Sequence, residues 1–470
     1  MYTTLGCTVC FAKLHPLFSR TLQINKIFSF LLLPKRSSFT PSYKVKVKKD
    51  TVPLFKYAGR KRNRRVHVCG LAATGALGVA HLAKPKGSQV PQHCKNAPYH
   101  VRLDYVSMAD CGYGFTVFAS HRLNTIKVWC CGVNSDSQIG FHKNPQQSPR
   151  KNEVSKPHLV RVIKPSDVPL PLTKPEKTRV TGVACGRAHT LILTDRDGVF
   201  AMGNNAHGQC GRPIIDGEIY EGSKKVRCIS HDNFSSPVTQ VHCGLDHSLF
   251  ITDKGELFAC GWGADGQTGL ETYEATCEPM QVKGDLNGER IIKVSSHADT
   301  TLALSDKNEV FGWGNSEYRQ LECVTDDSQL SVPQKLPFDE FGKIVDIAAG
   351  GTACMILNED GEVFVWGYGI LGKGPSLQDT SWPSKIPDTL FGRTAFNESV
   401  KVTKIACGRT YFAAITNRGD LFTWGKNKHG CLGIGHNRDQ FFPWKIVVGA
   451  EVTNVFCGAD HTVILSKTLA

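Results

Sequence analysis

The chain has 470 residues, of which 21% are charged, and a formal net charge of +14. This length allows one large repeat domain or two to three ordinary domains, and the composition excludes a chain that is disordered throughout. The positive charge is concentrated at one end: residues 1–103 hold 19 Lys and Arg and one acidic residue, whereas the remaining residues hold 37 basic and 41 acidic ones. A basic surface over the whole folded part is therefore excluded, although local basic patches are not.

Residues 1–60 have the composition of a mitochondrial transit peptide followed by a basic, disordered leader. The first 49 residues contain no Asp or Glu, carry Lys and Arg at intervals, and are rich in Ser and Thr. The apolar run at 27–33 is shorter than the roughly 20 residues of a transmembrane helix, and no other stretch is long enough. We therefore expect mitochondrial localisation, with secretion through this apolar run as the less favoured alternative.

Two alternating half-motifs fill residues 66–465. The first is Ala-Cys-Gly-x-x-His-Thr followed by an apolar stretch, as at 184–190. Its Cys-like positions recur every 50 to 58 residues after one longer interval of 74, and they are residues 111, 185, 243, 296, 349, 407 and 457. Such a period is typical of a propeller blade.

The second half-motif is an apolar or aromatic pair, Trp-Gly and a glycine turn, as at 421–433. An apolar stretch such as 190–194 and a turn such as Asp197-Gly198 separate the two halves, so each repeat predicts several short strands. Small residues suit the crowded strand nearest the axis, and we expect the Trp to pack between neighbouring blades.

The longest interval contains an insertion at 141–179 that is rich in Lys and Arg. It also contains Pro145, Pro149, Pro157, Pro165, Pro169, Pro171 and Pro175. We predict an extended, solvated loop there. Its basic character makes it a candidate RNA or ribosome contact, and a simple spacer is an equal alternative.

The two ends of the repeat region are complementary halves. Residues 66–78 carry a second half-motif alone, with Cys69 at the Trp position, and residues 455–465 carry a first half-motif alone. Six complete blades and one shared blade predict an all-β, seven-bladed β-propeller over residues 66–465. The last blade is closed by the N- and C-terminal segments, which leaves no sheet edge open in the ring.

This pattern resembles the regulator-of-chromosome-condensation repeat family, and the stretches 261–269, 312–318 and 366–374 resemble its mitochondrial branch. The resemblance implies a propeller that binds a small GTPase through one face and promotes guanine-nucleotide exchange, without bond chemistry and without a cofactor. Matching the family's contact positions, just before the motif His, implies a partner-binding role for Arg187, Asp246, Asp299 and Asp460. Ordinary turn residues are the alternative interpretation of these positions.

Three functions remain open after the resemblance. The first is a mitochondrial exchange factor for a dynamin-related GTPase of inner-membrane fusion. The second is an assembly scaffold associated with the mitochondrial ribosome or its large-subunit rRNA, and the third is a structural adaptor. The expected location is the matrix or, by peripheral association, the inner membrane.

The motif histidines and one glycine motif have simpler explanations than catalysis. His189, His247 and His461 occupy one repeat position, which indicates a structural hydrogen bond to the backbone of the neighbouring strand. The motif G-x-G-x-x-G at 367–372 has no helical pattern after it, so we expect a blade turn and not a phosphate-binding loop. The single C-x-x-C pair, Cys7 and Cys10, lies in the predicted transit peptide and is not interpreted as a zinc site, and no other metal-ligand spacing appears in the sequence.

Overall fold

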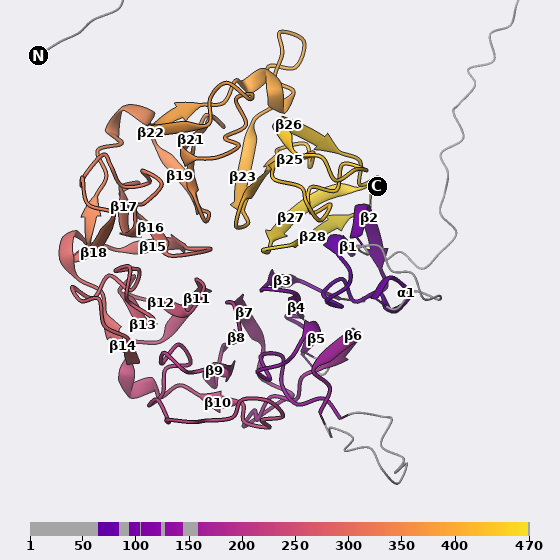
Figure 1. Cartoon of the computed structure of the whole chain (residues 1–470), viewed down its shortest axis with the longest axis vertical. Helices are drawn as coiled ribbons and strands as arrows, with labels where there is room; N and C mark the ends of the chain where they lie inside the picture. The colour runs from indigo at the N-terminus through magenta and orange to yellow at the C-terminus, as the bar shows by residue number, and fades with distance from the viewer. Residues whose placement is uncertain (1–63, 84–93, 104, 124–126, 144–157, 469–470) are drawn as a thin grey trace, which may run out of the picture. The chain divides into compact units, whose positions relative to one another are not determined.

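The computed structural model describes residues 64–83, 94–103, 105–123, 127–143 and 158–468. These residues form seven four-stranded sheets arranged as blades about a common axis (Figure 1), which confirms the predicted seven-bladed β-propeller. The predicted leader at 1–60 lies outside the described residues. We name the blades A to G; in every blade the strands run antiparallel, and the inner strand is nearest the axis.

Blades A to C come first in the chain, with strands given from the axis outward. Blade A contains β3 (Met108–Cys111), β4 (Phe115–Ala119), β5 (Val128–Val133) and β6 (Arg161–Asp167). Blade B contains β7 (Val180–Cys185), β8 (His189–Thr194), β9 (Gly198–Gly203) and β10 (Arg227–Cys228). Blade C contains β11 (Val238–Cys243), β12 (His247–Thr252), β13 (Leu257–Gly261) and β14 (Thr276–Gln281).

Blades D to F follow with the same order of strands. Blade D contains β15 (Ile291–Ser295), β16 (Thr300–Ser305), β17 (Val310–Asn315) and β18 (Gln329–Lys335). Blade E contains β19 (Ile344–Ala349), β20 (Ala353–Asn358), β21 (Val363–Tyr368) and β22 (Asp379–Lys385). Blade F contains β23 (Val402–Cys407), β24 (Tyr411–Thr416), β25 (Leu421–Gly425) and β26 (Gln440–Ile446).

Blade G closes the ring with strands from both ends of the described chain. Its order from the axis outward is β27 (Glu451–Cys457), β28 (His461–Lys467), β1 (Arg64–Leu71) and β2 (Cys94–Val101). The β1–β28 pairing is continuous, from Arg64 opposite Lys467 to Gly70 opposite His461. The predicted closure of the last blade by the two terminal segments is therefore confirmed.

Short helices connect the strands. The α-helix α1 (Ala80–Ala83) joins β1 to the segment before β2, and four 3-10 helices lie between blades: η1 (His231–Asn233), η2 (Gly284–Leu286), η3 (Asp339–Phe341) and η4 (Asp388–Phe391). No described helix is long and apolar enough to cross a membrane.

The core lies between neighbouring blades, because both faces of each sheet are covered. The second strand of blade B, with the sequence HTLILT, is buried at all six positions. Trp366 of blade E is fully buried among residues of blade D, and its indole N–H donates to the carbonyl of Gln320 at 2.8 Å. Cys69 holds the same place in blade G, where its thiol donates to the carbonyl of Cys431 at 3.3 Å. The motif Trp thus packs between blades, as expected.

The prediction of an extended, solvated loop at 141–179 is wrong in part. Arg161–Asp167 forms β6, the outer strand of blade A, and pairs with β5. Pro165 lies at the register shift of this pairing, where a missing N–H costs no ladder hydrogen bond. An outer strand exposes one edge and tolerates Pro and Lys, so its sequence is similar to that of a loop. Residues 144–157 lie outside the described part of the chain.

Candidate functional site: the rim of inner loops

Seven short loops join the inner strands to the second strands and lie together at one end of the blades; we call the last three residues of each loop the rim. They are residues 112–114, 186–188, 244–246, 297–299, 350–352, 408–410 and 458–460. Backbone hydrogen bonds join neighbouring loops, such as Arg187 N–H to the carbonyl of Leu245 at 2.8 Å and Gly351 N–H to that of Arg409 at 2.9 Å. These bonds hold side chains from different blades in fixed relative positions.

The first residue of each loop is glycine in six blades, and packing requires it. A Cβ atom at Gly186 would lie 2.2 Å from Cε1 of His189, the motif histidine of the same blade. In blade D the corresponding residues are His297 and Thr300, so a smaller side chain at the histidine position accompanies a larger one at the glycine position. The rim therefore carries one imidazole that the other loops lack.

The three motif histidines are fully buried, and each contacts a hydroxyl group of the next blade. The Nε2 atoms of His189, His247 and His461 lie 3.0 Å from Ser248 Oγ, 3.2 Å from Ser296 Oγ and 2.7 Å from Thr116 Oγ1, respectively. The prediction of a bond to the backbone of the neighbouring strand is therefore wrong, because the imidazole contacts a side-chain hydroxyl of the neighbouring blade instead.

Burial also determines the charge of two of these histidines. It lowers the pKa of His189 and of His247 to about 3, so both imidazoles are neutral at physiological pH. In blade F Tyr411 takes the histidine position, and its hydroxyl lies 2.8 Å from Thr462 Oγ1. The inter-blade contact therefore survives a change of residue type.

Arg187 and Asp246 form an ion pair between blades B and C. Nη2 of Arg187 lies 2.5 Å from Oδ2 of Asp246, and Nε donates to Oδ1 at 3.2 Å. The Arg187 side chain is 54% exposed and that of Asp246 is 9% exposed. Burial raises the pKa of Asp246, and the charge of Arg187 opposes this effect. The group presented to a partner is therefore the guanidinium and not the carboxylate.

Asp299 and Asp460 also have internal partners. Oδ1 of Asp299 accepts from the side-chain amide of Gln267 at 2.9 Å, and Oδ1 of Asp460 lies 2.8 Å from Nδ1 of His461. Burial raises the pKa of Asp299 to about 6. The structure brings Arg187, Asp246 and Asp299 together on three consecutive blades and places Asp460 in blade G.

Three exposed aromatic residues lie beside the rim. Trp262 is 37% exposed, and its backbone N–H donates to the carbonyl of Asp246 at 2.8 Å. Tyr368 is 49% exposed, and its backbone N–H donates to the carbonyl of Thr352 at 2.8 Å. The ring of Tyr318 stacks on that of Tyr368 with 6.0 Å between centroids. Sequence analysis did not identify these residues.

A positional signal for two of these aromatics exists in the repeat. The residue after the motif glycine is Asn204 in blade B and Asn315 in blade D, but Trp262 in blade C and Tyr368 in blade E. The preceding residue, Gly261, must be glycine, because a Cβ atom on it would lie 2.5 Å from the carbonyl oxygen of Asp246. Only blades C and E carry an aromatic side chain at this position, and these two side chains extend the rim outward.

The described residues show no candidate metal site. They contain no cluster of three or more His, Cys, Asp or Glu side chains that could hold a metal ion. The motif at 367–372 spans the last two residues of β21 and the turn after it, and the next regular element is the strand β22. The rim presents an exposed guanidinium and exposed aromatic rings, which are side chains frequent in macromolecular interfaces.

Comparisons with known proteins agree with this architecture. Residues 58–392 match the RCC1-like domain, and residues 402–431 and 418–465 match the regulator of chromosome condensation (RCC1) repeat. The mouse RCC1-like G exchanging factor-like protein is 49% identical over 451 residues, which cover 93% of this chain and 96% of the mouse protein. The human protein of that name is 49% identical over 427 residues, covering 89% and 90% of the two chains.

Solved structures show the same fold. The crystal structure of human WBSCR16 superposes with a TM-score of 0.80 at 49% identity and covers 87% of this chain and 100% of that one. Yeast RCC1 (Prp20), solved bound to Kap60, has a TM-score of 0.69 at 21% identity, covering 87% and 90%. The shared repeat, the seven blades closed by both termini and the extent of these matches show that the chain belongs to the RCC1-like family of β-propellers.

Proposed function

We propose that the chain is a mitochondrial guanine-nucleotide exchange factor for a dynamin-related GTPase of membrane fusion, and that it binds this GTPase through the rim. The observation that carries the proposal is the placement of Arg187, Asp246 and Asp299 on the rim loops of three consecutive blades, with an ion pair between Arg187 and Asp246. The names of the mouse and human relatives support exchange activity. The acid-free N-terminal sequence supports the mitochondrial location.

Exchange requires only differential binding. If the propeller binds the nucleotide-free GTPase more tightly than the loaded form, nucleotide affinity falls by the same factor, because the coupling is reciprocal. The exposed guanidinium of Arg187 can bond to an acidic side chain of the GTPase in its open form. The preformed ion pair with Asp246 lowers the entropy cost of placing that guanidinium.

Release of fluorescent GDP from purified candidate GTPases tests the proposal with the full-length chain. We expect catalytic amounts of the chain to accelerate release, and Arg187→Gln to reduce the acceleration about tenfold. Arg196→Gln is the matched control, because Arg196 lies in the β8–β9 turn at the opposite end of blade B.

Two results would contradict the proposal. Release that is unaffected by the chain for every dynamin-related GTPase of mitochondria would exclude the exchange function. Co-sedimentation with the mitochondrial large ribosomal subunit, combined with no effect on nucleotide release, would favour the assembly scaffold instead.

A further inference from the structure

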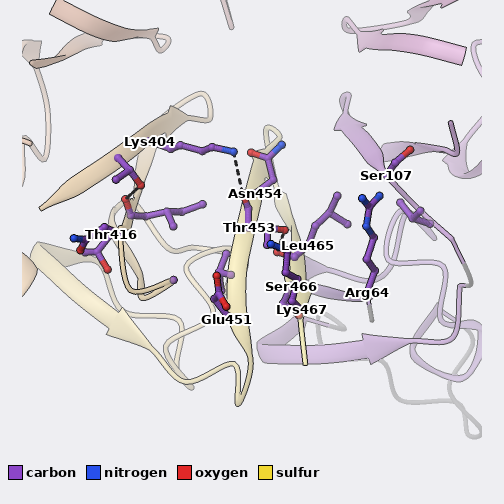
Figure 2. Close-up of a pocket in the computed structure, with 16 residues that line it drawn as sticks. Arg64, Ser107, Lys404, Thr416, Glu451, Thr453, Asn454, Leu465, Ser466 and Lys467 are labelled. Carbon is purple, nitrogen blue, oxygen red and sulfur yellow. Dashed lines mark hydrogen bonds between the residues drawn. The ribbon is translucent and has the colours of Figure 1, made fainter. Parts of the chain in front are cut away.

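A cavity of about 450 Å³ lies at the end of the blades opposite the rim (Figure 2). Blade F lines it with Asn417 and Gly419 of the β24–β25 turn, and blade G lines it with Glu451, the first residue of β27. Strand β1 contributes Arg64. The volume is within the range of small-molecule sites, about 300–1,000 Å³. Because both ends of the described chain form its wall, the cavity exists only when blade G is closed.

The charged residues that line the cavity are mostly cationic. Arg64, Lys404 and Lys467 line it together with one acidic residue, Glu451. Arg64 lies directly opposite Lys467 in the β1–β28 pairing, and Lys467 lies directly opposite Glu451 in the β27–β28 pairing. Like charges placed opposite each other destabilise a sheet. Glu451 can balance one of the two cations in this row, so a positive charge remains.

The three cations keep hydrogen-bond donors for a ligand. Among the described residues, Arg64 and Lys467 form no ion pair. Nζ of Lys404 donates one hydrogen bond, to the carbonyl of Thr453 at 2.9 Å (dashed in Figure 2), which fixes the ammonium group at the cavity wall and leaves two donors. Figure 2 shows Lys404 and Arg64 on opposite sides of the strand that carries Thr453.

We propose that this cavity is a binding site for a small phosphorylated ligand with two negative charges, contacted by Arg64, Lys404 and Lys467. Three cations and one carboxylate give the lining a net charge of about +2, which a ligand with two negative charges neutralises. A guanidinium suits phosphate because its planar donors bind two oxygens at once, and the ammonium groups supply point charges. The site lies away from the rim and is independent of the proposed exchange function.

Ligand-induced stabilisation of the full-length chain tests the proposal, with inorganic pyrophosphate as the probe. A ligand that binds only the folded cavity raises the apparent melting temperature, whereas binding to the basic leader at 1–60 does not. We expect a saturable rise of about 2 °C or more relative to sodium chloride at equal ionic strength. The double variant Arg64→Gln/Lys404→Gln should lose this rise.

Two comparisons make the test specific. Lys401→Gln is the matched control: Lys401 is an exposed lysine just before β23 that does not line the cavity, so it should keep the full rise. Without ligand, Arg64→Gln should melt no lower than the unmodified chain, because it removes the repulsion from Lys467. This second result separates loss of binding from loss of folding.

Three outcomes would overturn the proposal. The first is no saturable rise with pyrophosphate. The second is an equal rise in the double variant, which would place the binding elsewhere. The third is a larger rise with succinate than with pyrophosphate, which would assign the site to dicarboxylates.

Discussion

The imidazole of His297 in blade D donates a hydrogen bond from Nε2 to the carbonyl oxygen of Cys457 in blade G at 3.0 Å. Blades D and G are not neighbours in the ring, so this bond crosses the axis. His297 replaces the glycine of the other six rim loops, and its pKa is lowered to about 4 by burial. A neutral imidazole thus forms a hydrogen bond between two blades that are not neighbours in the ring.

We expect His297→Gly, which restores the glycine of the other blades, to lower the free energy of unfolding by about 1–3 kcal/mol, because the buried carbonyl of Cys457 loses its partner. Chemical denaturation followed by tryptophan fluorescence measures this change. Gln240→Ala is the control: it removes a more exposed bond, from Gln240 to the carbonyl of Ile292. Equal stability of His297→Gly and the unmodified chain would show that the bond across the axis contributes nothing.

The stability of the propeller should fall as the pH decreases from about 6.5 to 4. Burial lowers the pKa of several histidines to about 3 or 4; they are His67, His189, His242, His247 and His297. The unfolded chain binds protons at these groups near pH 6.5 and the folded chain does not, so acid favours unfolding. Asp110 and Asp299, each with a pKa raised to about 6, oppose this trend.

The five histidines outnumber the three carboxyls with raised pKa values, Asp110, Asp246 and Asp299, so we expect a lower unfolding midpoint at acidic pH. Urea titrations at pH 7.5, 6.0 and 5.0 measure the effect. The variant His297→Asn should show a smaller dependence on pH than the unmodified chain. A midpoint that rises between pH 6.5 and 5.0 would contradict the assignment of neutral buried histidines.

Trp366 should be one of the most important residues for stability. It is fully buried between blades D and E and bonds to the carbonyl of Gln320. We expect Trp366→Ala to cost about 3–5 kcal/mol, because the packed interface cannot fill the space of an indole. Trp444→Ala is the matched control, since Trp444 is 56% exposed on the outer strand β26. A similar loss in both variants would argue against blade-to-blade packing as the source of stability.

Trp262 should contribute to binding at the rim. Its side chain is exposed, its backbone N–H donates to the carbonyl of Asp246, and tryptophans are frequent hot spots of interfaces. We expect Trp262→Ala to weaken GTPase binding by about 2 kcal/mol, measured as the concentration of chain needed for half-maximal GDP release. Trp382→Ala, on the outer strand of blade E and 40% exposed, should leave that concentration unchanged. A larger loss of GTPase binding in Trp382→Ala than in Trp262→Ala would place the interface on the outer strands.

The number of blades and the closure of the ring could be predicted from the sequence because both depend on local patterns. Each blade repeats the same turn glycines and apolar stretches, and Cys69 could be aligned with Trp366 and Trp424 by motif position. The outer strands could not be predicted in this way. Arg161–Asp167 contains Pro165 and Lys164 and is only partly buried, so its pairing with β5 depends on the blade already being present.

The sequence by itself determined the fold, because seven copies of one short-range pattern all favour the same strands and turns. Only the tertiary structure decided the state of the functional side chains. Arg187 and Asp246 are 59 residues apart and meet because their blades are neighbours, so the exposed charge is that of Arg187. Arg64 and Lys404 line one cavity for the same reason: charge pairing and burial depend on distances that the closed ring sets and that spacing along the chain does not encode.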